Sequence, residues 1–313
     1  MDQSRDQLKE TFKNKKLALK VIFMFFISFF ILSAIINYID IVTIKELLTK
    51  VDIFYYFLCF IIFFIISYLT CIRFASAIEI SGYKLNKLKS WSYVLAVHPL
   101  NLFIPSKGGE LWKAYLLRKK VKYSSTIGCV IIEKLFDVLA LCLIGMIGST
   151  LVENHISNFV FLFIILLVLI IIKYIGLLTL PFGGKLIEKI SNVQNTFKIL
   201  IKKPILMFRL LTSSLFIWLS FALMIHFLFK GINYNTNFSY IMVVYPLSII
   251  IGLIPITIGG LGTRDTAFLY FFNIYDVPQE ASIIVSLSYF IFSYILPSII
   301  GFPFTIYYFF RSK

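Results

Sequence analysis

Seven charged residues stand beside or inside the apolar stretches of this chain, and their types indicate the handling of an anionic group. Three are cations and four are carboxylates: Lys113, Lys134 and Arg264, with Glu110, Glu133, Asp137 and Asp265. A charge at the centre of a bilayer costs roughly 2.5–3.5 kcal/mol on insertion scales, so such groups normally face a bundle interior or a cavity. Lysine and arginine in such a place can bind a phosphate or carboxylate. A neighbouring carboxylate can orient the cation or exchange a proton.

Three of these residues fall within one apolar run. Glu133 and Asp137 are four residues apart, so they share a helix face, and Lys134 lies between them. Lysine can also snorkel toward the nearer membrane surface. Both interpretations stay open for Lys134. Asp137 is deeper and too short to snorkel, which favours a functional role.

The remaining four residues follow two turns that interrupt apolar segments. The first turn contains Pro105, Gly108 and Gly109, and the second contains Pro255, Gly259, Gly260 and Gly262. The two prolines are 150 residues apart in a chain of 313. Helix-breaking residues at corresponding points of two membrane halves are a good sequence pointer to a transporter's binding site. The alternative is coincidence, because Gly and Pro are common in membrane helices.

Each turn has its own cation and carboxylate. Arg264 and Asp265 begin a new apolar helix after the second turn, where free amides and the helix dipole favour an anion. Glu110 and Lys113 form the equivalent pair after the first turn. Neither turn has the spacing of a nucleotide-binding loop. The four cysteines and three histidines are scattered, so we expect no metal, no cofactor and no catalytic site.

The elements that position these residues are membrane helices. The chain is 59% hydrophobic and 14% charged, whereas soluble domains carry about 25% charged residues, so we predict an all-α polytopic membrane protein. Six runs are long enough to cross a bilayer, although the last is interrupted by prolines and a glycine. They cover roughly residues 20–39, 52–72, 124–151, 157–180, 209–230 and 280–310. The apolar stretches 91–105 and 239–258 end at the two turns and are predicted to be re-entrant.

The distribution of cations predicts the topology. If both turns are re-entrant, the N-terminus, residues 73–122, residues 181–209 and the C-terminus share one side and hold 24 of the 30 lysines and arginines. The positive-inside rule makes that side cytoplasmic. The net charge of +15 therefore reflects topology and not nucleic-acid binding. Residues 181–209 are predicted to form an amphipathic helix on the cytoplasmic leaflet.

Three crossings per half reverse the second half relative to the first. We therefore predict a single integral membrane domain over 1–313, built from inverted repeats of about 1–155 and 156–313. Each repeat has three spans and one re-entrant segment, which gives about six to eight membrane helices. The two turns would then be opposed across the membrane, the first cytoplasmic and the second external.

At three stretches the chain resembles the flippase-like family that contains the transmembrane region of lysylphosphatidylglycerol synthase. These stretches are 104–117, 132–137 and 255–265. The family pattern has arginine where Lys113 and Lys134 stand and glutamate where Asp265 stands. It also has a basic residue in the last long helix, where this chain reads Ser286-Leu287-Ser288-Tyr289. The resemblance implies movement of a lipid between leaflets. Longer relatives carry a soluble lysyltransferase domain, and we expect none here because the chain ends at Lys313.

Three functions fit these observations. The first is a flippase for an anionic phospholipid, aminoacyl-lipid or glycolipid, in which Lys113, Lys134 and Arg264 hold the headgroup. The second is a secondary transporter of a small anionic solute. The third is a non-transporting membrane partner of a lipid- or glycan-modifying enzyme. In each case we expect membrane lipids as partners, no enzyme activity, and residence in the plasma membrane of a prokaryote with both termini cytoplasmic.

Overall fold

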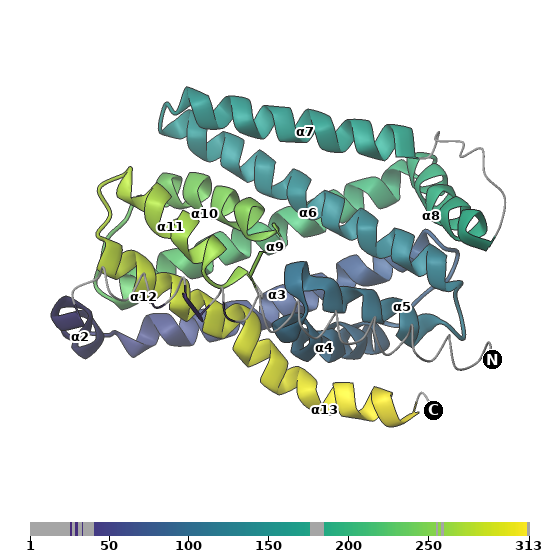
Figure 1. Ribbon diagram of the computed structural model, residues 1–313, viewed down its shortest axis with the longest axis horizontal. Coiled ribbons are helices and arrows are strands. Elements are labelled where there is room, and N and C mark those ends of the chain that lie inside the picture. The colour runs from purple at the N-terminus through teal and green to yellow at the C-terminus, as the bar shows by residue number, and fades with distance from the viewer. Residues whose placement is uncertain are drawn as a thin grey trace, which may run out of the picture.

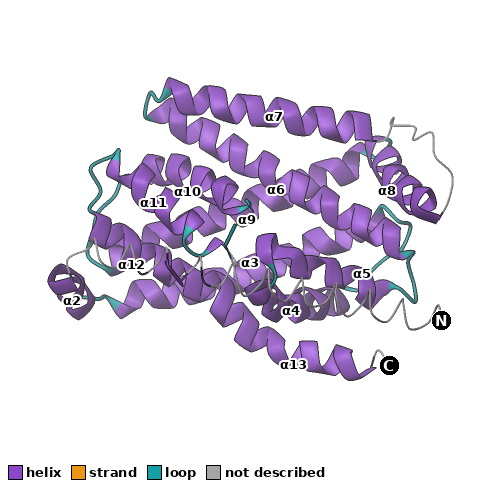
Figure 2. Cartoon of the chain, viewed as in Figure 1, coloured by secondary structure: helices purple, strands orange, loops and turns teal. Residues whose placement is uncertain are grey.

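The described part of the chain is helical throughout and contains no strand (Figures 1 and 2). This computed structural model describes residues 41–175, 185–254, 256–257 and 260–311, together with Phe26, Phe29, Phe30 and Ser33. The predicted first span at 20–39 lies largely outside the described residues, and Pro255 and Gly259 lie outside them as well.

The first group of helices surrounds the first turn. It comprises α2 (Ile41–Thr49), α3 (Ile53–Glu79), α4 (Lys87–Phe103), the 3-10 helix η1 (Pro105–Leu111), α5 (Trp112–Leu117) and α6 (Tyr123–Leu151). Asp52 and Asn86 cap α3 and α4, because each side chain accepts a hydrogen bond from the amide two residues later. In Figure 1, α4 and α5 lie in the right half of the bundle.

The second group follows a similar order. It comprises α7 (His155–Ile175), α8 (Lys185–Ile201), α9 (Pro204–Gly231), α10 (Phe238–Gly252), α11 (Thr263–Asn273), α12 (Gln279–Phe290), the π-helical segment η3 (Ile291–Ile295) and α13 (Leu296–Arg311). Figure 1 places α10 and α11 in the left half, opposite α4 and α5. Residues 185–201 form the predicted connector helix, with Phe197 and Leu200 buried and Lys198 exposed.

Four described helices are long and apolar enough to cross a membrane: α3, α7, α9 and the continuous helix over Gln279–Arg311. They match four of the predicted spans. The predicted span at 124–151 is α6, whose 29 residues extend about 44 Å at 1.5 Å per residue. Large apolar side chains on the outside of the bundle are exposed, including Ile156, Phe159 and Phe163 on α7. Such a surface suits contact with lipid chains.

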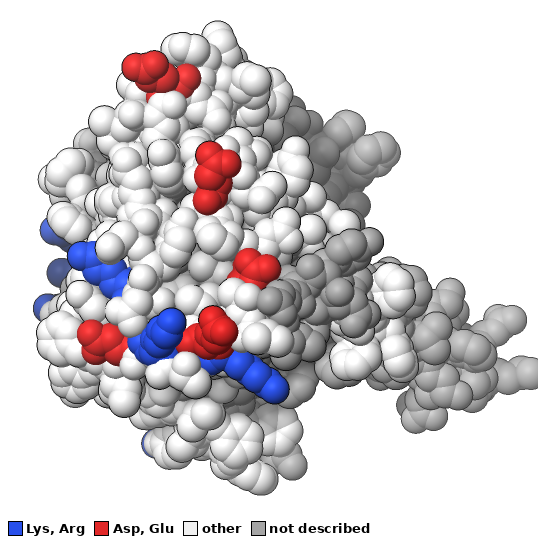
Figure 3. Space-filling model, turned by 90° about the vertical axis from the view of Figure 1, so that its left-hand side faces the viewer, with Lys and Arg blue, Asp and Glu red and all other residues white. Residues whose placement is uncertain are grey.

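The two ends of the bundle differ in charge. The end with α2 and the α11–α12 connection is shown in Figure 3, where a few acidic and basic groups, several of them side by side in the lower part of the view, stand on a mostly uncharged surface. The opposite end holds α8, the C-terminal end of α13 and the α5–α6 connection (Figure 1). Exposed lysines there include Lys89, Lys119, Lys120, Lys198 and Lys202.

Close helix crossings depend on small residues. A Cβ atom at Gly301 of α13 would lie 2.1 Å from the Leu95 carbonyl oxygen of α4. At the crossing of α6 with α10, a Cβ atom at Gly148 would lie 2.6 Å from the Cβ of Met242. Glycine at such positions lets two helix backbones approach each other within the membrane.

Replacement of Gly301 by alanine is expected to force α13 away from α4. The change should reduce stability by about 1–3 kcal/mol, the usual cost of overpacking a close contact. The unfolding temperature of the purified protein in detergent measures this effect. Ile299→Ala is the control, because this side chain on the same helix is 66% exposed and should leave the temperature nearly unchanged. Equal stability of the Gly301→Ala protein and the wild type would contradict the crossing as described.

Candidate functional site

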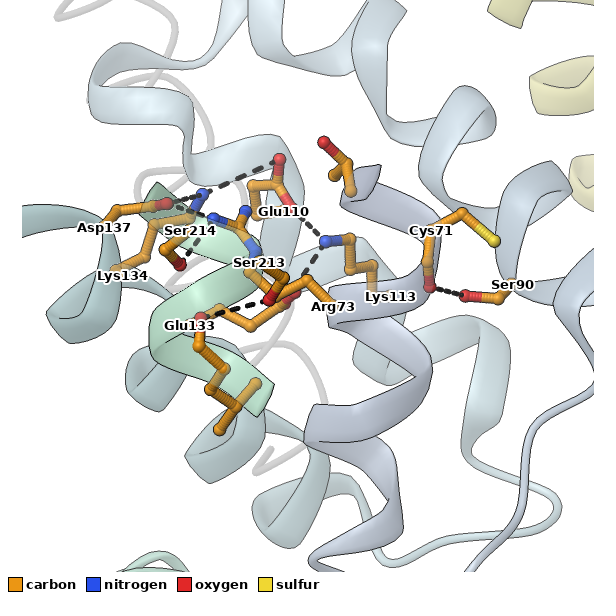
Figure 4. Close-up of polar contacts among 12 residues, drawn as sticks. Cys71, Arg73, Ser90, Glu110, Lys113, Glu133, Lys134, Asp137, Ser213 and Ser214 are labelled. Carbon is orange, nitrogen blue, oxygen red and sulfur yellow. Dashed lines mark hydrogen bonds and ion pairs between the residues drawn. The ribbon is translucent and has the colours of Figure 1, made fainter. Parts of the chain in front are cut away.

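Six charged side chains form a buried cluster between α3, η1, α5 and α6 (Figure 4). We call it the ion-pair cluster. It contains three cations and three carboxylates: Arg73, Lys113 and Lys134, with Glu110, Glu133 and Asp137. Five of the six are at most 8% exposed, and only the Lys134 side chain is substantially accessible, at 34%. The charges balance, so burial leaves no net charge within the cluster.

Lys113 lies at the centre of one part of the cluster. Its ammonium pairs with Glu110 and lies 3.3 Å from Glu133 Oε2, and it stands 4.5 Å from the centre of the Phe74 ring. A second link joins Arg73 Nε to Glu133 Oε1 at 3.5 Å. Asn101 on α4 donates to Glu110 Oε1 at 3.4 Å. The first turn is thereby fastened to both α4 and α6.

Asp137 links this cluster to α9. Its carboxylate pairs with Arg73 and accepts a 2.8 Å hydrogen bond from Trp218 Nε1. Arg73 also donates to Ser214 Oγ at 3.2 Å. Lys134 Nζ lies 3.4 Å from Asp137 Oδ2 and 3.9 Å from Glu110 Oε1. Lys134 therefore reaches across the exposed edge of the cluster.

The second turn places Arg264 and Asp265 at the start of α11. Asp265 accepts three kinds of hydrogen bond: from the Gly262 amide at 2.9 Å, from Ser286 Oγ at 2.5 Å and from Arg264 Nη2 at 2.6 Å. Gly262 has φ +95°, a conformation that favours glycine and aims its amide at this carboxylate. The anion predicted at this helix start is therefore supplied by the chain itself, as Asp265.

Arg264 is 3% exposed and retains an unused donor. Its Nη1 is buried without a hydrogen-bond partner among the described residues. The guanidinium carbon lies 5.0 Å from the centre of the Tyr289 ring and 5.7 Å from that of Tyr294. These rings add cation–π contacts to the ion pair that Arg264 makes with Asp265. A buried guanidinium nitrogen with no acceptor favours an anionic ligand at this position.

Two cavities lie beside these groups. The central cavity, about 190 Å³, is lined by Lys134, Asp137, Val138, Leu141, Trp218, Ile249, Gly252, Leu253, Gly260, Arg264 and Tyr294. A smaller cavity of about 70 Å³ is lined in part by Arg73, His98, Asn101 and Glu110. Four side chains line both cavities: Lys134, Asp137, Trp218 and Tyr294. They form a partition between the first turn and the second.

The structure thus brings the predicted residues together in two groups. Lys134, Asp137 and Arg264 share the central cavity with Gly260 of the second turn. Glu110, Lys113 and Glu133 belong to the ion-pair cluster, and Lys113 lines neither cavity. Gly108 and Gly109 lie in η1, and Pro105 is its first residue.

Three residues around the cavities were not predicted: Arg73, Trp218 and Tyr294. Arg73 lies just beyond the predicted span at 52–72, among the cations that indicate topology, whereas α3 continues to Glu79 and carries Arg73 into the bundle. Tyr294 stands in η3, and π-helical turns are frequent at functional sites. Pro297 follows, and its missing amide cannot bond to the carbonyl four residues earlier. Pro297 is therefore the sequence feature from which the irregular turn at Ile291–Ile295 could have been predicted.

The central cavity is lined by cationic, acidic and apolar side chains. Within the described ranges, no group of three or more His, Cys, Asp or Glu side chains could hold a metal ion. Lys134 and Arg264 can form ion pairs and hydrogen bonds with an anionic group in the cavity. Among the described residues that line this cavity, Asp137 is the carboxylate.

Comparison with known proteins agrees with the membrane character of the chain. Two relatives from the archaeon Methanocaldococcus jannaschii are membrane proteins of the UPF0104 group. MJ1595 is 26% identical over 314 residues, covering 88% of this chain and 91% of the relative. MJ1078 is 27% identical over 207 residues, covering 62% of this chain and 88% of the relative. No solved structure shows a significant match. The family described as the lysylphosphatidylglycerol synthase TM region matches residues 18–301, and the chain belongs to this family.

Proposed function

We propose that this membrane protein moves an anionic lipid between leaflets, without covalent chemistry, by binding the headgroup in the central cavity. The observation that carries this proposal is the buried Arg264, whose Nη1 has no partner among the described residues and which lines the same cavity as Lys134. A phosphate between them would satisfy that nitrogen and pair with both cations. The family assignment supports a lipid-related role.

The walls of the central cavity support a lipid over a fully polar ligand. Val138, Leu141, Ile249 and Leu253 form an apolar wall, whereas the charged groups come from α6 and α11. A phospholipid presents the same division between its headgroup and its acyl chains. We therefore propose that the chains pass along the α6–α10 side while the headgroup contacts Arg264.

The carboxylates have separate roles in this proposal. Asp265 orients Arg264, and Glu110 and Glu133 neutralise Lys113. Lys113 is thus assigned to positioning the first turn, and Lys134 and Arg264 to the ligand. Asp137 is shared between Arg73, Lys134 and Trp218, so a change in its pairing could couple the two cavities.

We also propose that the two halves are inverted repeats. Helices α3, α4 and α5 begin at residues 53, 87 and 112, and α9, α10 and α11 begin at 204, 238 and 263, a constant offset of 151. In this relation α10 corresponds to α4, and α6 corresponds to α13. Packing supports it, because α4 contacts α13 and α10 contacts α6. Lys113 and Arg264 are both the second residue of their short helix. The equivalent cations therefore differ in surroundings: Lys113 pairs with Glu110 and Glu133, whereas Arg264 pairs with Asp265 alone and lines the cavity.

The exposed lysines support an orientation in the membrane. We propose that the end with α8 and the C-terminus faces the cytoplasm, in agreement with the positive-inside rule. The central cavity, next to the second turn, would then lie toward the external half of the membrane. We also propose that the protein resides in the plasma membrane.

A small anionic solute is a second candidate, and the volume of the central cavity favours it. About 190 Å³ is less than the roughly 300–1,000 Å³ of typical ligand pockets, so a free phosphate or carboxylate fits without rearrangement. The same two cations would bind it. This candidate differs from the first in requiring no passage for acyl chains.

Reconstitution separates the two candidates. Proteoliposomes containing fluorescent phosphatidylglycerol or phosphatidylcholine would report lipid movement, and radiolabelled phosphate would report solute uptake. The proposal predicts faster movement of phosphatidylglycerol than in protein-free liposomes and little movement of phosphatidylcholine. Phosphate uptake without lipid movement would support the second candidate and contradict the first.

A further inference from the structure

A second cationic site lies away from the central cavity, at the end of the bundle that holds the C-terminus. It is a pocket of about 320 Å³ lined by Lys89, Tyr93, Tyr115, Leu116, Arg118, Lys119, Lys120, Tyr307, Tyr308 and Arg311. We call it the basic pocket. Five of its ten lining residues are cations, and none of the described residues that line it is an aspartate or glutamate. We propose that the basic pocket binds an anionic phosphate group, most naturally the headgroup of a lipid in the adjacent leaflet.

The pocket is built by three elements that meet at this end. Lys89 stands in the first turn of α4, residues 118–120 join α5 to α6, and Arg311 ends α13. The floor is aromatic: the Tyr93 and Tyr308 ring centres are 5.0 Å apart, and the Tyr308 and Ser92 hydroxyls are hydrogen-bonded at 2.6 Å. Tight packing of α4 against α13 holds this floor in place.

Aromatic rings hold the cations of the basic pocket. The Arg118 guanidinium lies 3.5 Å from the centre of the Tyr115 ring and donates to the Tyr115 carbonyl. Arg311 lies 5.4 Å from the Tyr307 ring centre, and Lys120 Nζ lies 5.4 Å from that of Tyr83. The aromatic rings orient the Arg311 and Lys120 cations but leave their charge available to a ligand. A carboxylate partner would cancel that charge.

A neighbouring surface pocket shows the contrast. It is lined by Lys84, Lys87 and Arg209 but also by Glu79, and Arg209 Nη1 lies 3.4 Å from Glu79 Oε2. The cations there have a carboxylate among them, as is usual on protein surfaces. None of the described residues that line the basic pocket is an aspartate or glutamate, so it is the stronger candidate for an anion site at this end.

Adjacent apolar side chains favour a lipid as the source of the phosphate. Leu88, Phe309 and Phe310 flank the pocket in sequence and are 73%, 58% and 68% exposed. Tyrosine and cationic residues between membrane helices on the cytoplasmic side are a common form of anionic headgroup site. Headgroup binding here would be independent of transport through the central cavity.

The test compares two triple variants, each made in the Arg264→Gln/Asp265→Asn protein so that the central cavity does not contribute to lipid binding. All substituted lysines are exposed. The first is Lys89→Gln/Lys119→Gln/Lys120→Gln, and the control is Lys198→Gln/Lys202→Gln/Lys203→Gln at the same end of the bundle. Binding of phosphatidylglycerol, phosphatidylcholine and soluble glycerol phosphate to detergent-purified full-length protein is measured by native mass spectrometry. Each lysine near an anionic lipid adds about fivefold to affinity, so the first variant should bind phosphatidylglycerol about 100-fold more weakly than the control.

Comparison of phosphatidylglycerol with soluble glycerol phosphate distinguishes a lipid headgroup from a free phosphate. Loss of phosphatidylglycerol binding without any binding of glycerol phosphate identifies a lipid headgroup, and loss of both identifies a general phosphate site. Either result supports the basic pocket. Equal phosphatidylglycerol affinity in the two triple variants overturns it, as does equal affinity of the wild type for phosphatidylcholine. Arg264→Gln should retain this binding, so failure of the transport proposal would be seen separately.

Discussion

Replacement of Arg264 by glutamine is expected to slow the movement of phosphatidylglycerol by about 10- to 100-fold. Glutamine keeps part of the side-chain volume but removes the charge and the unused Nη1 donor. A hydrogen bond to a charged group contributes roughly 1.5–3 kcal/mol, which corresponds to this range of rates when the headgroup must be bound during transfer. The rate of fluorescent lipid movement in proteoliposomes is the measurement.

Two further variants separate binding from folding at this position. Arg264→Gln alone leaves the Asp265 carboxylate buried without its cation, so Arg264→Gln/Asp265→Asn restores the charge balance. Arg264→Lys retains the charge and should keep part of the activity. A double variant that is as stable as the wild type and moves lipid at the wild-type rate would remove Arg264 from the mechanism.

Replacement of Lys113 by methionine is expected to destabilise the protein by about 3–5 kcal/mol, the usual cost of removing one partner of a buried ion pair. Lys113 is 1% exposed and pairs with both Glu110 and Glu133, so its loss leaves two buried carboxylates short of a cation. The unfolding temperature in detergent reports the change. Its effect on transport should follow from stability and not from ligand binding.

The control for Lys113 uses an ion pair at the surface. Arg209 and Glu79 are joined at 3.4 Å, but their side chains are 55% and 36% exposed, so Arg209→Met should cost at most about 1 kcal/mol. Lys113→Met/Glu133→Gln should recover part of the loss, because one uncompensated charge is removed. If Lys113→Met were as stable as Arg209→Met, the ion-pair cluster would not hold the first turn in place.

Much of the fold could be predicted from the sequence, because long apolar runs leave helices as the main option in a bilayer. The spans at α3, α6, α7, α9 and α12–α13 follow directly from those runs. Helix α2 was not predicted, since Ile41–Thr49 is short and its apolar residues do not form a long run. The inverted repeat was predicted from the two turns and stays a proposal.

The site could be predicted only in part. Local spacing identified Glu133, Lys134 and Asp137 on one helix and Arg264 beside a glycine turn. Local spacing could not show that Arg73 pairs with Asp137, because the two are 64 residues apart in the sequence. Their contact depends on how α3 packs against α6. The same limit applies to Lys113 and Arg264. Their local sequences are alike, and only the packing shows that Lys113 pairs with two carboxylates from η1 and α6, whereas Arg264 pairs with the adjacent Asp265 and lines a cavity.

Ser286 and Tyr289 illustrate a further limit. The family resemblance implies a basic residue in the last long helix, where this chain has uncharged side chains. In the structure Ser286 donates to Asp265, and Tyr289 lies under Arg264. The last helix therefore supports the second turn through a hydroxyl and a ring. This contribution could not be read from charge patterns.

A structure determined by electron cryo-microscopy in nanodiscs of phosphatidylglycerol would show whether the central cavity binds a lipid headgroup. We expect density for a phosphate group between Arg264 Nη1 and Lys134 Nζ, with an acyl chain along Val138, Leu141 and Ile249. The same density should be absent from nanodiscs of the Arg264→Gln/Asp265→Asn variant. A central cavity that holds only water in the wild type, with ordered lipid confined to the outside of the bundle, would contradict headgroup binding at Arg264.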